Sequence, residues 1–141
     1  MLRRLKENKK KGFTLVELIV VLVILAILAA LLVPALTGYI DRAKRKSIVA
    51  ETRQVVMAAQ TLADEYYGTQ TTGTFAPDQI KKDDVKKLAE VTGTINSITY
   101  QTTSEVDKKS IGTVLTVEYT DSTYTCKYNA EATGDKYTVT P

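Results

Sequence analysis

The sequence contains no histidine and no tryptophan, and it has a single cysteine, Cys126. Without histidine, the chain lacks the commonest general base and metal ligand at neutral pH. One cysteine cannot form a disulfide within the chain, so a disulfide framework is excluded. The HExxH, CxxC, GxSxG and Walker-loop patterns of common catalytic and nucleotide sites are also missing. We therefore assign no catalytic, cofactor-binding or metal-binding residues and do not expect an enzyme.

The acidic residues offer only weak alternatives to that view. Asp83 and Asp84 fit the acidic first turn of a short helix better than a catalytic pair of carboxylates. Asp107, Asp121 and Asp135 lie in expected loops, where carboxylates can bind calcium, but the pattern of a calcium-binding loop is missing. The eight tyrosines are more typical of a sheet face than of a stacking platform for nucleic acid.

Net positive charge is confined to the N-terminus. Residues 1–12 carry six basic side chains and one acidic one, which leaves 13 basic and 15 acidic side chains from Phe13 onward. Without its first twelve residues the chain is mildly acidic, which argues against a dedicated nucleic-acid-binding protein.

What the sequence does have is one long apolar run. Between Phe13 and Val33, only Thr14 and Glu17 are not apolar. As a helix this run spans about 31 Å, close to the hydrocarbon thickness of a bilayer, and it predicts a membrane-spanning helix. The six basic residues before the run outnumber the four that follow it, which favours a cytoplasmic N-terminus.

Two plain readings of the run leave Glu17 unexplained. An ordinary secretory signal has an apolar core of about 7 to 15 residues, shorter than this one, and no acid at its start. A simple single-pass anchor has no need of a carboxylate. Because intramembrane acids cost up to about 3 kcal/mol, they usually mark a function.

The stretch KKGFTLVEL, residues 10–18, resembles the processing and assembly motif of type IV prepilins and the related pseudopilins, which carry a class III signal peptide. The resemblance covers about residues 1–67. In that family a prepilin peptidase cuts after the glycine and methylates the new N-terminus. The resemblance implies cleavage between Gly12 and Phe13, which leaves N-methyl-Phe13 as the first of 129 residues.

The glutamate of the family's motif corresponds to Glu17, and the family's proline corresponds to Pro34. The resemblance implies that Glu17 of an incoming subunit pairs with the Phe13 amine of a neighbour in a filament. A pair within one helix is also geometrically allowed, since the two residues share a face. Either way, both charges are expensive in an apolar setting unless they are paired. The sequence leaves open whether Glu17 pairs with a neighbour's amine or with its own.

Pro34 and Gly38 form the weakest part of the expected long helix, because proline removes a backbone hydrogen bond and bends the axis. We expect a kink there. The resemblance implies that the segment can also unwind when the subunit enters a filament.

After Gly38 the pattern becomes amphipathic, and one helix is expected from residue 13 to about 67. The basic cluster at 42–46 reads mainly as a solvated face, with contact to lipid headgroups or to acids of neighbouring subunits as the lesser alternative. The expected apolar stripe consists of Ile48, Thr52, Val55, Ala59, Leu62 and Tyr66, widened by Val49, Val56 and Ala63.

The remaining residues predict a loop over 69–78, a short helix from Ile80 to Val91 and an antiparallel meander lying across the long helix. In the second strand, Leu115, Val117 and Tyr119 are expected to face inward. The fold class is therefore α+β, the class of the pilin fold that the resemblance implies. The four expected strands are 97–103, 113–119, 124–129 and 136–140.

The expected organisation has four parts, and it implies a structural role. They are a cleaved leader (1–12), a transmembrane and filament-core helix (13–38), the amphipathic half of that helix (39–68) and a globular head (69–141). The resemblance implies a subunit that starts as a single-pass protein of the cytoplasmic membrane and polymerises into an extracellular pilus for adhesion, twitching motility or DNA uptake. Its partners would be further copies, prepilin peptidase, the assembly platform and its ATPases, the membrane, and a host surface or DNA.

Two alternatives remain open at this point. One is a pseudopilin of a type II secretion or competence system, and the other is a membrane-tethered binding module that does not polymerise. Lone Cys126 cannot close the C-terminal disulfide loop of many type IV pilins, so their surface loops and receptor sites do not carry over to this chain.

Overall fold

The computed structural model describes residues 12–70, 75–103 and 110–141. The chain forms two compact units, one ending at Ile40 and the other running from Asp41 to Pro141. Most of the expected leader, part of the loop expected over 69–78 and Asp107 lie outside the described residues.

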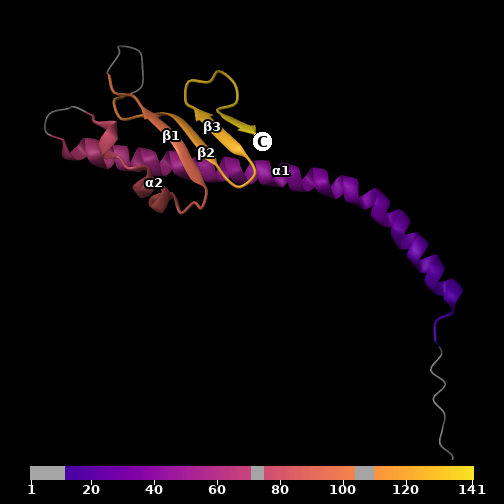
Figure 1. The fold of residues 1–141 in the computed structure, drawn as a ribbon. Helices are drawn as coiled ribbons and strands as arrows, with labels where there is room; N and C mark the ends of the chain where they lie inside the picture. The colour runs from indigo at the N-terminus through magenta and orange to yellow at the C-terminus, as the bar shows by residue number, and fades with distance from the viewer. Residues whose placement is uncertain (1–11, 71–74, 104–109) are drawn as a thin grey trace, which may run out of the picture. The chain divides into compact units, whose positions relative to one another are not determined.

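A single helix, α1, runs from Leu15 to Thr69 over 55 residues (Figure 1). The predicted helix over 13–67 is thus confirmed to within two residues at each end. Pro34 and Gly38 both lie inside α1, and the hydroxyl of Thr37 donates a hydrogen bond to the Pro34 carbonyl at 2.9 Å. The chain is helical through this segment. A kink in the free subunit and unwinding in a filament both stay predictions.

The second unit contains a four-stranded antiparallel sheet in the order β1-β2-β3-β4, which confirms the predicted meander and the α+β class. Its first strand was predicted over 97–103 and lies three residues earlier. Because β2 offers partners only from Thr120 back to Val114, β1 is held to the matching residues. The strands are β1 (Thr94–Tyr100), β2 (Val114–Thr120), β3 (Thr125–Asn129) and β4 (Tyr137–Thr140).

The prediction that Leu115 faces inward with Val117 and Tyr119 is wrong for Leu115. Val114 is buried in its place, while Leu115 is half-buried. The register between β1 and β2 shifts at this point, which makes Leu115 the extra residue of a β-bulge. A bulge reverses the alternation of side chains along its strand.

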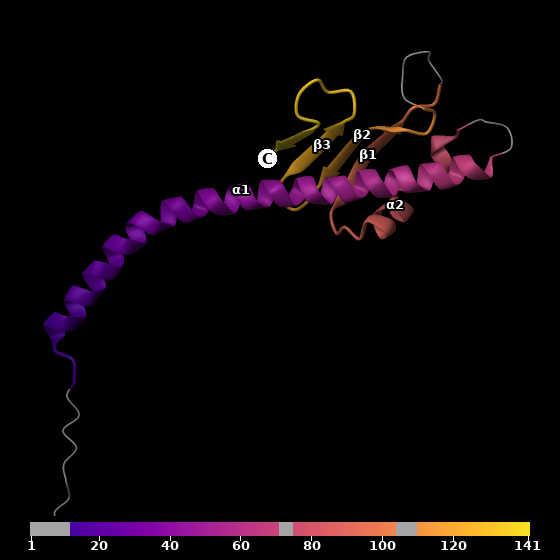
Figure 2. The ribbon, with the colours of Figure 1, turned by 180° about the vertical axis from the view of Figure 1, so that it is seen from behind.

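The core of the second unit lies between the sheet and the second half of α1, which the strands cross in both views (Figures 1 and 2). The predicted apolar stripe forms this contact, although Leu62 and Tyr66 are only partly buried. Small side chains on the stripe, such as Ala59 and Ala63, are fully buried and allow close packing of a sheet on the helix. The residues with no exposed area are Ile48, Thr52, Val55, Ala59, Ala63, Val85, Tyr119 and Cys126.

A short helix, α2 (Lys82–Ala89), adds Val85 and Ala89 to this core. The helix predicted over 80–91 is two residues too long at each end. A separate 3-10 turn at Pro77–Gln79 precedes α2, and Glu90 ends it in a left-handed conformation with φ of 54°. Asp83 and Asp84 lie in the first turn of α2, as expected.

Tyr119 ties three segments of the second unit together. Its hydroxyl donates to Glu51 Oε2 of α1 at 2.5 Å and accepts the Gly93 N–H at 2.8 Å. Burial, with a further contribution from Glu51, raises the pKa of Tyr119 to about 12. The protonated hydroxyl therefore stays a hydrogen-bond donor at any physiological pH.

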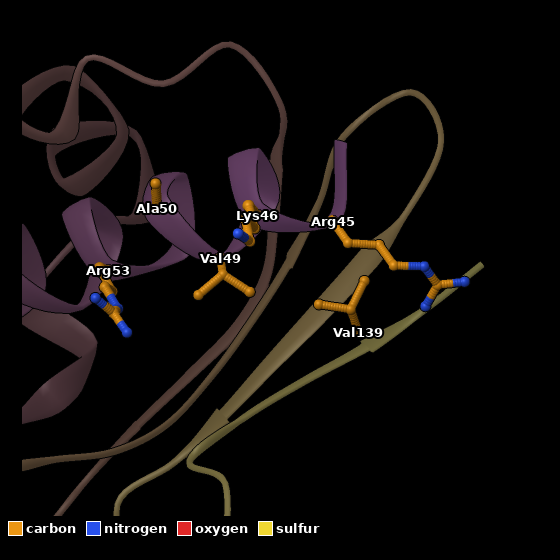
Figure 3. Close-up of a pocket in the computed structure, with 6 residues that line it drawn as sticks. All are labelled: Arg45, Lys46, Val49, Ala50, Arg53 and Val139. Carbon is orange, nitrogen blue, oxygen red and sulfur yellow. The ribbon is translucent and has the colours of Figure 1, made fainter. Parts of the chain in front are cut away.

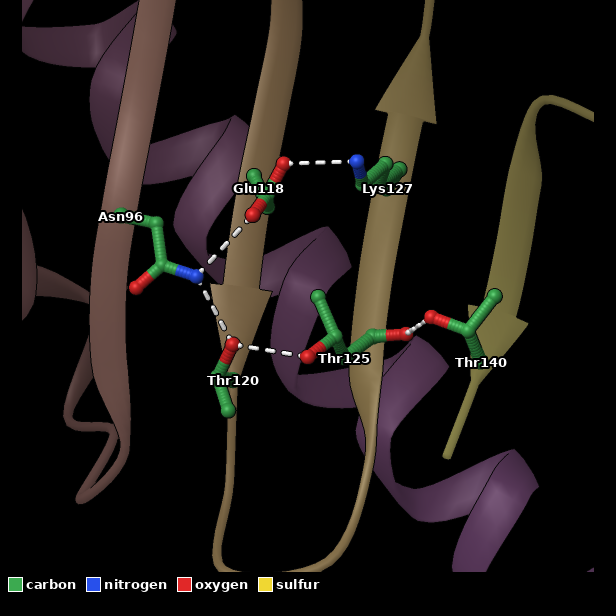
Figure 4. A network of polar contacts seen from close by, with 6 residues as sticks. All are labelled: Asn96, Glu118, Thr120, Thr125, Lys127 and Thr140. Atoms are coloured by element: carbon green, nitrogen blue, oxygen red, sulfur yellow. Dashed lines mark hydrogen bonds and ion pairs between the residues drawn. The ribbon is translucent and has the colours of Figure 1, made fainter.

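The outer face of the sheet is polar, as the threonine and lysine content predicts. Lys127 Nζ lies 3.0 Å from Glu118 Oε2, and Asn96 donates to the Thr120 hydroxyl at 2.8 Å (Figure 4). Such cross-strand pairs stabilise a solvent-facing sheet modestly. The part of this face that the structure describes thus carries polar side chains paired across the strands.

Gly93 is the position where the fold most clearly requires a glycine. A Cβ atom there would lie 2.4 Å from both the Thr120 carbonyl oxygen and the Tyr119 hydroxyl oxygen. We expect Gly93→Ala to lower the free energy of unfolding by about 1–3 kcal/mol, because the junction with Tyr119 has to open. Urea titration of the full chain in neutral detergent, followed by tyrosine fluorescence, measures the change.

Gly134→Ala is the matched control, because a Cβ atom there meets nothing within 4 Å. Equal stability of the two variants would contradict the role of Gly93.

Candidate functional site

The segment where α1 begins holds three of the residues that the sequence singles out. Gly12 and Phe13 precede the helix, both are exposed, and Phe13 retains 86% of its accessible surface. The Gly12–Phe13 peptide bond is therefore accessible and not locked in helical hydrogen bonds. A Cβ atom on Gly12 would meet nothing within 4 Å, so the fold itself does not require glycine at this position.

Thr14 and Glu17 form a reciprocal cap at the start of α1. The Thr14 N–H donates to Glu17 Oε2 at 2.9 Å, and the Glu17 N–H donates to the Thr14 hydroxyl at 3.3 Å. This is the capping-box arrangement, in which two backbone N–H groups at a helix start are satisfied by side chains. The sequence analysis missed it, although Thr-x-x-Glu before an apolar run is its signal.

The cap determines the environment of the Glu17 carboxylate. One oxygen, Oε2, accepts the Thr14 N–H, and within residues 12–70, 75–103 and 110–141 no hydrogen bond reaches Oε1. The positive end of the helix dipole also favours a negative group in the first turn. The carboxylate is thus held in place by its own chain, with Oε1 left to accept a further donor.

The helix that follows Glu17 is apolar on every side. From Leu18 to Ile40 each residue is exposed in this chain, and Ile24, in the middle of the apolar run, retains 51% of its surface. A helix that is apolar all round has to be covered by lipid or by other helices. In the part of the chain that the structure describes, α1 is long and apolar enough to cross a membrane, judged by length and composition.

Pro34 and Gly38 are exposed on the same helix, and a Cβ atom on Gly38 would meet nothing within 4 Å. The packing of the chain thus gives no reason for glycine at residue 38. The remaining reason for a glycine at residue 38 is the conformational freedom of its backbone.

The other candidate residues serve the fold. Asp121 Oδ1 accepts the N–H groups of Thr123 and Tyr124, each at 2.6 Å, and this turn accounts for its carboxylate. The described residues contain no group of three or more potential metal ligands. Cys126 is fully buried, and burial raises the pKa of its thiol, which is the state of an unreactive packing residue.

The basic cluster at 42–46 differs in part from its prediction as a solvated face. Arg42, Lys44 and Lys46 are exposed. Arg45 is half-buried, however, with its Nε 2.9 Å from Asp41 Oδ2 and its guanidinium 5.0 Å from the centre of the Tyr124 ring. Asp41 and Arg45 lie four residues apart on α1, but Tyr124 comes from the residue before β3, so no local pattern predicts its contact with Arg45.

Comparison with known proteins concerns the segment around the start of α1. Residues 8–33 match the family model described as the prokaryotic N-terminal methylation motif, the class III signal peptide of type IV pilins and pseudopilins. The match spans Gly12, Phe13 and Glu17 and ends one residue before Pro34. Searches of curated proteins and of solved structures found no match. The motif and the apolar helix together fit a membrane-anchored precursor of pilin or pseudopilin type.

The capping box yields a test in the unprocessed chain. We expect Thr14→Ala to speed amide hydrogen exchange at Glu17 and Leu18 by about fivefold, because an N-terminal cap contributes roughly 1 kcal/mol. Thr14→Ser keeps the hydroxyl and should exchange like the parent. Exchange measured by NMR in neutral detergent micelles distinguishes the two. Unchanged exchange in Thr14→Ala would show that the cap does not stabilise the helix start.

Proposed function

We propose that this chain is a type IV pilin structural subunit that polymerises through α1 after removal of residues 1–12. The observation that carries the proposal is the methylation motif at 8–33, placed on an exposed all-apolar helix whose first turn holds Glu17. The part of the chain from Asp41 onward would form the head of each subunit.

Processing is the first step of the proposal. Prepilin peptidase would cut between Gly12 and Phe13, a bond that lies two residues ahead of the helix and is exposed. Because the fold does not require glycine at residue 12, the requirement would come from the peptidase. Methylation of the new amine keeps its positive charge.

Assembly is the second step. A new amine at Phe13 supplies the donor that the second oxygen of Glu17 lacks in the unprocessed chain. When the apolar helices pack into a filament, water leaves, and each amine and each carboxylate then needs a partner. A pair between neighbouring copies would satisfy both groups and set the axial register of otherwise uniform helices, as one buried polar group does in a coiled coil.

We take the partner to be a neighbour's amine and not the subunit's own. Glu17 is already bonded to Thr14 of its own chain, which holds the carboxylate at the helix start. A partner from another copy adds to this bond without displacing it. Pro34 and Gly38 would then let the helix adjust its path inside the filament, and this role is also part of the proposal.

Glu17→Gln separates charge from capping. Glutamine at this position can still accept the Thr14 N–H, as it does in capping boxes generally, but it cannot form an ion pair. We expect the variant to be inserted and cleaved normally while the yield of sheared filaments falls at least tenfold. Thr14→Ala is the matched control, because it removes the cap, leaves the charge and should still form filaments.

Electron microscopy and immunoblotting of sheared fractions measure the filament yield. A normal yield from Glu17→Gln would refute the register role of Glu17 and favour a membrane-tethered module that does not polymerise. For a pilin we expect long surface fibres at the native expression level of the parent chain. Fibres seen only on overexpression would instead identify a pseudopilin.

A further inference from the structure

The sheet of the second unit has an open edge at β4. The strand order ends with β4, and in the part of the chain that the structure describes no strand pairs with its far side. The other edge strand, β1, lies beside α2, and Lys82 Nζ of α2 donates to the Asn96 carbonyl of β1. An open edge presents unpaired N–H and C=O groups, to which an extended chain can add as a further strand.

The register of β4 shows which of its backbone groups are free. The Asn129 N–H of β3 donates to the Lys136 carbonyl, just before β4, at 2.9 Å. Because hydrogen-bonded pairs alternate along an antiparallel ladder, Tyr137 and Val139 point their N–H and C=O groups away from β3. The backbone of these two residues is therefore available to a further strand.

A groove of about 510 Å³ lies between this edge and α1 (Figure 3). Val139, whose backbone groups are free, also lines the groove with its side chain. A strand added to β4 would place every second side chain on the same side of the sheet as Val139, facing the groove. Backbone and side chains of one segment could thus be recognised together. The lining residues are Arg45, Lys46, Val49, Ala50, Arg53 and Val139.

The groove keeps a positive charge after both acids of this part of α1 are counted. Asp41 pairs with Arg45, which balances one of the three lining cations. Glu51 lies two residues before Arg53, which turns it about 200° away around the helix. It is hydrogen-bonded to β2 and does not line the groove. Among the described residues no ion pair engages Lys46 or Arg53, so these two cations face an incoming ligand.

The spacing of these cations predicts a pattern for the added strand. The Arg53 guanidinium lies 5.1 Å from the centre of the Tyr137 ring, at the start of β4. Lys46 is about 10 Å from Arg53 along the helix axis. Val49 and Val139 line the groove beside them. On a strand, the first and third side chains of one face are about 13 Å apart. A segment with the pattern acid-x-apolar-x-acid therefore matches the groove.

A second copy of this chain is a poor occupant. Two copies paired through β4 would bring the Lys46 and Arg53 side chains of both grooves together, and like charges facing each other across strands are destabilising. The other edge strand of a second copy, Thr94–Tyr100, contains no acidic residue. The charge of the groove thus favours a segment of a different protein.

We propose that β4 and this groove bind an extended segment of another protein with the pattern acid-x-apolar-x-acid. The segment pairs with β4 as a further strand. Its apolar side chain lies against Val49 and Val139, and its two acids meet Lys46 and Arg53. This gives the second unit a peptide-binding surface that is separate from the assembly role of Glu17 and does not require polymerisation.

The test uses the full chain in neutral detergent micelles and the peptide acetyl-TETVTET-amide, whose two glutamates and valine alternate with threonines. At saturating peptide, amide hydrogen exchange measured by NMR should slow at least tenfold at Tyr137 and Val139, because their N–H groups become hydrogen-bonded. The same peptide N-methylated at the valine nitrogen keeps its charges but loses the bond to the Val139 carbonyl. We expect it to bind at least tenfold more weakly.

Charge variants test the groove. In Lys46→Gln/Arg53→Gln we expect the affinity for the peptide to fall about tenfold, or roughly threefold for each charge removed. Lys46→Arg/Arg53→Lys keeps both charges and should bind like the parent chain. Lys81→Gln/Lys87→Gln is the matched control, because it removes two exposed charges outside the groove and should leave the affinity unchanged.

Unchanged exchange at Tyr137 and Val139 would overturn the proposal, as would equal affinity of the N-methylated peptide or of Lys46→Gln/Arg53→Gln. Slower exchange at these two amides in the chain alone, increasing with its concentration, would make a second copy the occupant and overturn the assignment to another protein. Tighter binding of a short DNA duplex would overturn the assignment to a peptide. The readout does not depend on filaments, so it stays separate from the Glu17→Gln test.

Discussion

An ionised carboxylate at the head of an all-apolar helix has to be hydrogen-bonded or paired before the helix can leave water. Glu17 is in that position, and much of the chain's proposed behaviour depends on how it is satisfied. In the unprocessed chain the Thr14 N–H occupies one of its oxygens. That bond stabilises the helix start and leaves the second oxygen for a donor that cleavage before Phe13 would create. In the proposed function, processing and assembly would thereby be coupled through a single side chain.

In the second unit, a small sheet packs on one face of α1. A stripe of small and β-branched residues on α1 provides the apolar contact, and Tyr119 adds a polar link between β2, Glu51 and Gly93. Close to the apolar run in sequence, Asp41, Arg45 and Tyr124 form a second polar link between helix and sheet. A head fastened at both places can keep its shape while the preceding part of α1 changes its surroundings.

The sequence predicted the elements that local patterns determine. The bounds of α1, the stripe from Ile48 to Tyr66 and the order of the strands follow from periodicity and turn residues. The start of β1 and the bulge at Leu115 were missed, because each depends on which residues of the partner strand are available. The environment of Arg45 was missed for the same reason, since Tyr124 reaches it from elsewhere in the unit. The Thr14–Glu17 cap is different, because its signal was present in the sequence and only its meaning was overlooked.

Mass spectrometry of a sheared surface fraction tests the central claim most directly. Processing and export together predict a subunit that begins at N-methylated Phe13 and contains residues 13–141, recovered in high-molecular-weight material. The same fraction from a Glu17→Gln strain should lack it, while the membranes of that strain hold the processed subunit. Chains that begin at Met1 and are confined to membranes would contradict the account.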